Sequence, residues 1–277
     1  MVFTSTIVPT IIDAQHPGAG SALEAWRRRE LLSFLVWRDL KVRYKQTVLG
    51  VAWAVVHPLA LMVVFTLVFS GMLKVNSGSL PYAAFVCAGL VPWTFMSNSA
   101  TLAMRSLTEN VPLITRVAIP REILPLASVL ASVFDTLIAL ALTLVFIAGL
   151  VGTLPGSAVL LPAVLALQLL LAVGIALLVA ALNVRYRDIR FVMPLLFQLW
   201  MYASPIIYPL EEVPPTWRVA YDLNPMVGIV HCYRAALFES VTFEPRLALI
   251  ALCSSLLLFL VGFSYFRAME PKLADMI

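Results

Sequence analysis

The sequence RDLKVRYK, from Arg38 to Lys45, places five charged side chains directly before an uncharged, largely apolar run from Gln46 to Leu73. A helix of that length would extend roughly 40 Å, which exceeds the hydrocarbon core of a bilayer at about 30 Å. The junction therefore predicts a membrane surface. Because cationic residues flank membrane helices on the cytoplasmic side, we expect the charged stretch to be cytoplasmic.

The composition agrees with a protein that crosses the membrane several times. Of 277 residues, 61% are hydrophobic and only 12% are charged, more apolar surface than a soluble domain could bury. The net charge of +4 comes from short basic clusters between apolar runs, so it predicts membrane orientation and not a nucleic-acid partner. The three cysteines are isolated and the three histidines lack ligand spacing, so we expect no metal site.

The apolar runs predict an all-α membrane protein with six transmembrane helices. Turn-forming residues and charged connections separate the runs, and the Gly152–Ser157 stretch divides an uncharged segment that is too long for one crossing. The expected spans are Thr47–Leu73, Tyr82–Met104, a third that follows the Arg105–Glu122 connection and ends near Val151, a fourth that ends at Arg185, Phe191–Leu210 and Leu247–Phe266.

The distribution of basic residues predicts the orientation. An even number of spans puts both termini on one side, and most arginines and lysines fall on that side. The positive-inside rule makes it the cytoplasmic side of the inner membrane. We expect a flexible cytoplasmic tail over residues 1–20, a membrane domain over 47–267 and a second cytoplasmic tail over 268–277.

Two segments do not fit a simple up-and-down bundle. Residues 21–46 open with a capping box at Ser21–Glu24 and carry an apolar run too short to span, which predicts a cytoplasmic interface helix. The connection Glu211–Pro245 contains Asn224 and Pro225, an N-cap and first-turn pair, before another short apolar run. We expect external half-membrane helices there, between spans 5 and 6, with Asn224, Pro225 and Arg234 in a lid over the bundle.

Asp135 is the one acidic residue inside the predicted spans, roughly 20 Å beyond Arg121 by helical rise. Two interpretations stay open. An intramembrane carboxylate is a candidate proton site or substrate contact. Alternatively, it is hydrogen-bonded to a neighbouring helix, next to Gln168 or Ser132.

The chain contains no G-x-x-x-x-G-K-[ST] phosphate loop, so any nucleotide energy must come from another subunit. Five ordered blocks resemble the permease subunits of type-2 ABC exporters for polysaccharides such as O-antigen, capsule or teichoic acid. The blocks are RDLKVRYKQTVLGVAWAVVHPL (38–59), LITRVAIPREILPLASVLAS (113–132), LNVRYRDIRFVMP (182–194), MYASPIIYP (201–209) and LNPMVGIVHCYRAALF (223–238).

The resemblance implies a homodimer of permeases, which are not enzymes themselves, with two copies of a separate ATPase subunit that binds ATP and Mg. It also implies that the Ser106–Arg116 connection is a coupling helix that contacts the ATPase. An ordinary solvated loop is the alternative. The residues expected at the ATPase contact are Glu109, Val111, Leu113, Ile114 and Arg116, together with Trp26, Arg29, Trp37 and Arg38.

The path of the cargo is predicted from arginines and aromatic rings. Arg185, Tyr186, Arg187 and Asp188 are candidates for a cytoplasmic entrance, because arginine pairs well with phosphate; topology alone also explains their charges. Sugars stack on aromatic faces, although interfacial aromatic belts use the same residues. The candidates for channel lining are Trp53, Phe65, Phe69, Phe197, Trp200 and Tyr202.

The sequence thus predicts the permease of an ATP-driven exporter for a lipid-linked polysaccharide. One alternative is a permease of the same fold for a small hydrophobic compound or drug. A second is a membrane enzyme acting on polyprenyl-linked sugars, but such an enzyme would need clustered acids or a metal motif, and the charges here are isolated.

Overall fold

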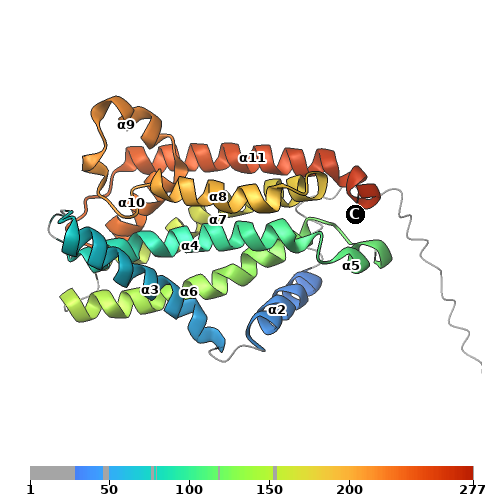
Figure 1. Ribbon diagram of the computed structural model, residues 1–277, viewed down its shortest axis with the longest axis horizontal. Coiled ribbons are helices and arrows are strands. Elements are labelled where there is room, and N and C mark those ends of the chain that lie inside the picture. Colours follow the sequence, from blue (N-terminus) through green and yellow to red (C-terminus); the bar gives the residue numbers. More distant parts are fainter. Residues whose placement is uncertain are drawn as a thin grey trace, which may run out of the picture.

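The computed structural model describes residues 29–45, 50–75, 78, 80–117, 119–151 and 155–276, and every regular element in these ranges is a helix (Figure 1). This confirms the all-α class. The expected tail over residues 1–20 and the capping box at Ser21–Glu24 lie outside the described residues.

Four of the described helical segments are long and apolar enough to cross a membrane: Val55–Met72, Ile123–Leu150, Gly156–Arg185 and Pro245–Leu273. They belong to α3 (Trp53–Phe65) with the π-helical stretch Thr66–Met72, α6 (Ile123–Val151), α7 (Leu161–Arg185) with the 3-10 turn Gly156–Leu160, and α11 (Pro245–Met276). Helix α4 (Tyr82–Ser106) is as long as α7 but carries more polar side chains. The remaining helices are α2 (Arg29–Lys45), α5 (Val111–Arg116), α8 (Ile189–Tyr202), α9 (Pro215–Asp222) and α10 (Pro225–Leu237).

The fifth predicted span is shorter than expected. Helix α8 has 14 residues and ends at Tyr202, whereas the prediction ran to Leu210. The next residues form turns, and Ile206 N–H donates to the carbonyl of Ser204 at 2.7 Å. Proline lacks an amide hydrogen and its ring clashes with the preceding helical turn, so Pro205 stops the helix instead of only kinking it. At the other end of the chain, α11 continues through residues 268–276, which were predicted to be a tail.

Helix α7 lies at the centre of the bundle, between α4 and α11 (Figure 1). Its contact with α11 is close because two glycines meet there. A Cβ added to Gly262 would lie 2.0 Å from the carbonyl oxygen of Gly174, and one added to Gly174 would lie 2.5 Å from the Cα of Phe259. Small residues that let backbones approach are the usual means of packing helices in lipid, where the hydrophobic effect does not drive association.

A buried polar contact joins α7 to two neighbours. The amide of Gln168 donates to the carbonyl of Pro92 in α4, and its oxygen accepts from the hydroxyl of Tyr233 in α10, both at 2.6 Å. A smaller core at the other end of the bundle packs α2 against α4, α6 and α11. Its buried side chains include Leu35, Leu107, Ile123, Phe266 and Leu273.

Helices α3 and α8 leave much of their surface open. Large apolar side chains are exposed along both, among them Val63 and Val64 on α3 and Phe191, Leu195 and Leu199 on α8. Leu67 and Met72, in the π-helical stretch after α3, are exposed as well. In a bilayer such side chains contact lipid or another protein, so this surface is compatible with membrane insertion.

Candidate functional site

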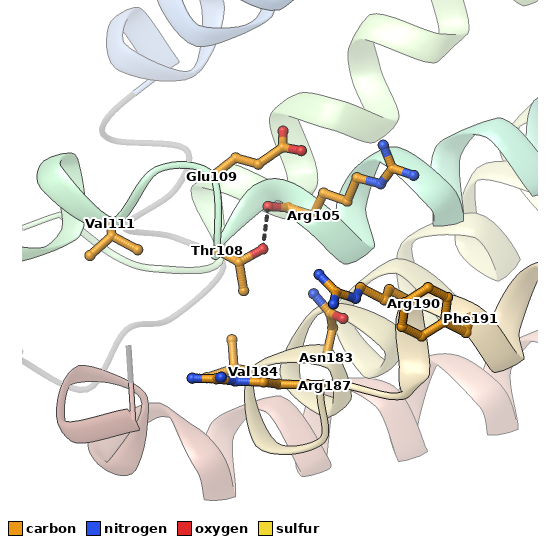
Figure 2. Close-up of a pocket in the computed structure, with 9 residues that line it drawn as sticks. All are labelled: Arg105, Thr108, Glu109, Val111, Asn183, Val184, Arg187, Arg190 and Phe191. Carbon is orange, nitrogen blue, oxygen red and sulfur yellow. Dashed lines mark hydrogen bonds between the residues drawn. The ribbon is translucent and has the colours of Figure 1, made fainter.

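A cavity of about 920 Å³ opens between the ends of α4, α7 and α8 (Figure 2). The lining consists mostly of polar and charged side chains, with an aromatic ring at one edge: Arg105, Thr108, Glu109, Val111, Asn183, Val184, Arg187, Arg190 and Phe191.

Local structure fixes the two walls of the cavity. Arg105 lies in the last turn of α4, and the hydroxyl of Thr108 donates back to its carbonyl at 3.1 Å. Across the cavity, the amide of Asn183 in α7 donates to the carbonyl of Met104 at 2.9 Å, which ties the two helices together. The backbone becomes extended at Tyr186, which ends α7, and a short turn then starts α8. Figure 2 shows Arg187 and Arg190 on this second wall, opposite Arg105 and Thr108.

The cavity is cationic. Three arginines line it with a single carboxylate, Glu109, and no ion pair among the described residues includes Arg105, Arg187 or Arg190. The guanidinium of Arg190 lies 4.7 Å from the ring centroid of Phe191, which holds it at the edge of an apolar surface. Guanidinium groups present planar forks of donors that match phosphate or carboxylate oxygens, so this arrangement can attract and bind an anion.

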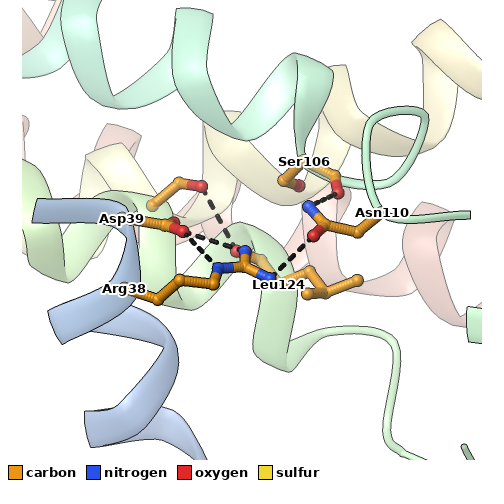
Figure 3. Close-up of polar contacts among 6 residues, drawn as sticks. Arg38, Asp39, Ser106, Asn110 and Leu124 are labelled. Atoms are coloured by element: carbon orange, nitrogen blue, oxygen red, sulfur yellow. Dashed lines mark hydrogen bonds and ion pairs between the residues drawn. The ribbon is translucent and has the colours of Figure 1, made fainter. Parts of the chain in front are cut away.

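A polar junction beside the cavity connects α2 to the chain between α4 and α5 (Figure 3). Arg38 donates to the side-chain oxygen of Asn110 at 2.9 Å and pairs with Asp39 at 2.9 Å. The amide of Asn110 in turn donates to the carbonyl of Ser106, at the end of α4, at 2.8 Å. The junction therefore links α2 to the α4–α5 connection and to the end of α4 through side-chain hydrogen bonds.

Asp135 has partners that differ from those predicted. Its carboxylate contacts the guanidinium of Arg43 and the hydroxyl of Tyr44, both near the end of α2. Gln168 instead contacts Pro92 and Tyr233. Burial, reinforced by the neighbouring carboxylate, raises the pKa of Tyr44 to about 12, so the phenol stays a neutral donor. Of the two interpretations, the structure supports a carboxylate bound to a neighbouring helix, but that helix is α2.

The residues predicted to contact an ATPase lie on α2 and around α5. Leu113 and Ile114 are half-buried against the core that contains Leu35, while Val111 lines the cavity. Arg29, Trp37, Glu109 and Arg116 are exposed, and Trp37 has 65% of its surface accessible. Trp26 lies outside the described residues. Their role in an ATPase contact stays a prediction.

The loop predicted as an entrance is only partly in the cavity. Arg187 lines it, whereas Tyr186 and Asp188 are exposed and do not. Arg185 points to α11, with its guanidinium 4.0 Å from the sulfur of Met269 and 5.1 Å from the ring of Tyr186. The entrance role of the four residues stays a prediction.

The opposite end of the bundle is held together by Asn224. Its side-chain oxygen accepts from the Met226 amide at 3.0 Å, which confirms the predicted cap of α10, and from the indole of Trp200 at 2.8 Å. Its amide donates to Ala203 and Ser204. Arg234 is buried, donates to the carbonyl of Ile206 at 3.0 Å and stacks on Phe85 at 3.5 Å. These contacts close this end, although a lid role stays a prediction.

The aromatic residues predicted to line a channel lie in different surroundings. Trp53 and Tyr202 are exposed, whereas Phe197 is 5% exposed within the main core. Phe65 and Phe69 form an edge-to-face pair with centroids 6.0 Å apart, and Trp200 packs against Trp93 at 5.9 Å. Within this chain they do not converge on one cavity of the described residues, and channel lining stays a prediction.

Sequence reasoning missed Arg105, Arg190 and Asn110 as site residues. Each lies in a connection that the sequence placed on the cytoplasmic side of the membrane. The sequence therefore indicated that these residues share one side, but it did not show which connections lie next to one another. The packing of the helices determines that.

Long apolar helices around a tightly packed centre, with a cationic cavity at one end, define a polytopic membrane protein. The family model described as ABC-2 type transporter matches residues 30–238, and the chain belongs to this family.

Named relatives are similar over nearly the whole chain. An O-antigen export system permease protein from Myxococcus xanthus is 32% identical over 92% of this chain and 98% of its own length. A protein of the same description from Klebsiella pneumoniae is 27% identical over 90% of this chain and 95% of its own length. A polysialic acid transport protein from Escherichia coli is 24% identical over 86% of this chain and 93% of its own length.

Proposed function

We propose that the chain is the membrane-spanning permease subunit of an ATP-driven exporter that moves a lipid-linked polysaccharide across the cytoplasmic membrane. The observation that carries this proposal is the end-to-end similarity to a protein described as an O-antigen export permease, which covers 92% of the chain. Other relatives have names that refer to polysialic acid transport and to capsule polysaccharide export, and they support the same class of cargo. They favour a polysaccharide over a small hydrophobic compound.

The proposed topology has six crossings and two cytoplasmic termini. Helices α4 and α8 supply the second and fifth crossings beside the four long apolar segments. Helix α8 alone would cover about 21 Å, less than a hydrocarbon core. The turns after it and helix α10 pack against protein at the outer end, where non-helical backbone within a membrane is tolerated. Helix α2 then begins at the cytoplasmic interface, and its last turn reaches Asp135 in α6.

The energy comes from a separate ATPase in this proposal. Two copies of that subunit hold ATP and Mg, and two copies of the present chain form the pathway. The contact between Arg38 and Asn110 supports a route for the motion, because a displacement of the α4–α5 connection would carry α2 with it.

Deletion of the gene in its native host tests the cargo. We expect surface polysaccharide to disappear and lipid-linked polysaccharide to accumulate on the cytoplasmic side, with recovery when the gene is returned on a plasmid. Surface polysaccharide is measured by electrophoresis and glycan staining, and the trapped intermediate by lipid extraction. Normal surface polysaccharide in the deletion strain would contradict the proposal and favour a different cargo.

A further inference from the structure

We propose that the cationic cavity binds the phosphate groups of an anionic lipid whose hydrocarbon chain lies along the exposed face of α8. This inference rests on the proposed function and specifies how its substrate is held. It assigns Arg105 and Arg190 a binding role together with Arg187, and it makes Phe191 the point where the polar and apolar parts of the site meet.

The head-group part of the site follows from charge and geometry. Arg105, Arg187 and Arg190 enter one cavity from two walls, and none of them is neutralised by an ion pair among the described residues (Figure 2). Several guanidinium groups together provide enough donors for the many oxygens of a diphosphate. Glu109 in the same lining opposes anion binding and reduces the charge of the cavity.

The hydrocarbon part of the site follows from the surface next to the cavity. Phe191, Leu195, Leu199 and Tyr202 recur at spacings of three or four residues and so lie along one side of α8. Their exposed fractions are 68%, 57%, 56% and 47%. The stripe extends about 16 Å from the edge of the cavity at helical rise, long enough for a lipid chain to lie against it.

Continuity between the two parts favours a lipid over the other candidate occupant, an acidic segment of a partner protein. Arg190 and Phe191 are adjacent in sequence and stacked, so the charged cavity passes directly into the apolar stripe. An acidic peptide would use the arginines but would gain nothing from the exposed side chains of Leu195, Leu199 and Tyr202 farther along α8.

A binding assay with the complete permease and its ATPase in detergent tests this site. The probe is geranylgeranyl diphosphate, compared with geranylgeraniol, which lacks the phosphates, and with inorganic diphosphate, which lacks the chain. We expect the diphosphate lipid to bind more tightly than either. Arg105→Gln, Arg187→Gln and Arg190→Gln should each weaken its binding by about 10- to 100-fold, the range for a lost charged hydrogen bond, and leave geranylgeraniol unchanged.

Three further variants sharpen the assay. Glu109→Gln should tighten binding of the diphosphate lipid by about threefold, because it removes a like charge from the cavity. Leu199→Asn should weaken both the lipid and the alcohol. Lys272→Gln removes an exposed cation from the same end of the bundle, outside the cavity, and should change neither.

The possible outcomes separate this inference from the proposed function. Wild-type binding by all three arginine variants would overturn the site. Equal binding of inorganic diphosphate and the lipid would overturn the α8 part. Loss of the ATPase from the arginine variants during purification, with unchanged lipid binding, would assign the cavity to the partner protein. If gene deletion leaves surface polysaccharide normal while the arginine variants still lose lipid binding, the site stands and the polysaccharide cargo fails.

Discussion

Helices α7 and α3 are both strongly apolar, yet they lie in opposite surroundings. In an 18-residue apolar stretch of the segment that includes α7, 56% of the residues are buried within the protein, whereas in the 18-residue segment that includes α3 only 6% are. Helix α7 is enclosed by α4, α6, α10 and α11, and α3 rests on the side of the bundle. The two helices show which part of the molecule is a fixed scaffold and which part is open to lipid or to other proteins.

The difference follows from side-chain size and polarity more than from hydrophobicity. Helix α7 carries buried small residues, such as Ala172 and Ala180, as well as the buried amides of Gln168 and Asn183. Helix α3 is built mainly from valine, leucine and methionine. Lipid solvates those large apolar side chains as well as a protein interior does, so only close packing and polar contacts favour helix association. Small and polar residues therefore distinguish a core helix from a peripheral one here.

The same leucine-to-alanine change in both regions should give the largest difference. Leu171 in α7 is fully buried, and Leu171→Ala should lower the free energy of unfolding by about 2–4 kcal/mol because a cavity forms. Leu67 lies just beyond α3 in the same span, and 65% of its surface is exposed. Leu67→Ala should change the free energy of unfolding by less than about 0.5 kcal/mol. Thermal unfolding in detergent measures both. Equal losses would contradict the assignment of α3 as peripheral.

The glycine contact between α7 and α11 provides the next effect. Gly262→Ala would place a methyl group 2.0 Å from the carbonyl oxygen of Gly174, so the helices would have to separate, at a cost of about 1–3 kcal/mol. Gly149→Ala is the matched control in α6, because a Cβ there meets nothing within 4 Å. The control should be neutral or slightly stabilising, since alanine favours helix. A higher melting temperature for Gly262→Ala than for the wild type would refute the close contact.

The sequence predicted well the features that depend on a few consecutive residues. Four of the uncharged runs correspond to helical segments long and apolar enough to cross a membrane, and Asn224 with Pro225 specifies a helix start through adjacent residues. Pro205 follows the end of α8 by three residues, and the chain does not resume the helix after it. The strength of such a break depends on the contacts of the following turns, which local sequence does not contain.

The features that the sequence left open depend on residues far apart in the chain. Arg38 and Asn110 are 72 positions apart, and Arg43 and Asp135 are 92 apart. A single sequence gives the depth of Asp135 by counting residues along its own helix, but it does not give the path of α2. The cationic cavity has the same origin, since Arg105 and Arg190 line one cavity only through the packing of α4 against α7 and α8.

Loss of the contact between Arg43 and Asp135 should have the smallest effect on stability. This contact attaches α2 to α6. Both side chains are partly exposed, at 25% and 17%, so Asp135→Asn should lower the free energy of unfolding by about 1 kcal/mol or less. Asp39→Asn, which removes a carboxylate that pairs with the adjacent Arg38, is the matched control and should cost less. A double-mutant cycle with Arg43→Gln measures the coupling by thermal unfolding.

Transport measurements on the same variants separate the two interpretations of Asp135. If its carboxylate holds α2 against α6, Arg43→Gln and Asp135→Asn remove the same contact and should reduce export to a similar degree, with no further loss in the double variant. If it were a proton site, Asp135→Asn alone would abolish export while Arg43→Gln would leave much of it. Because the carboxylate contacts both the guanidinium of Arg43 and the phenol of Tyr44, which lie together on α2, we expect the first pattern.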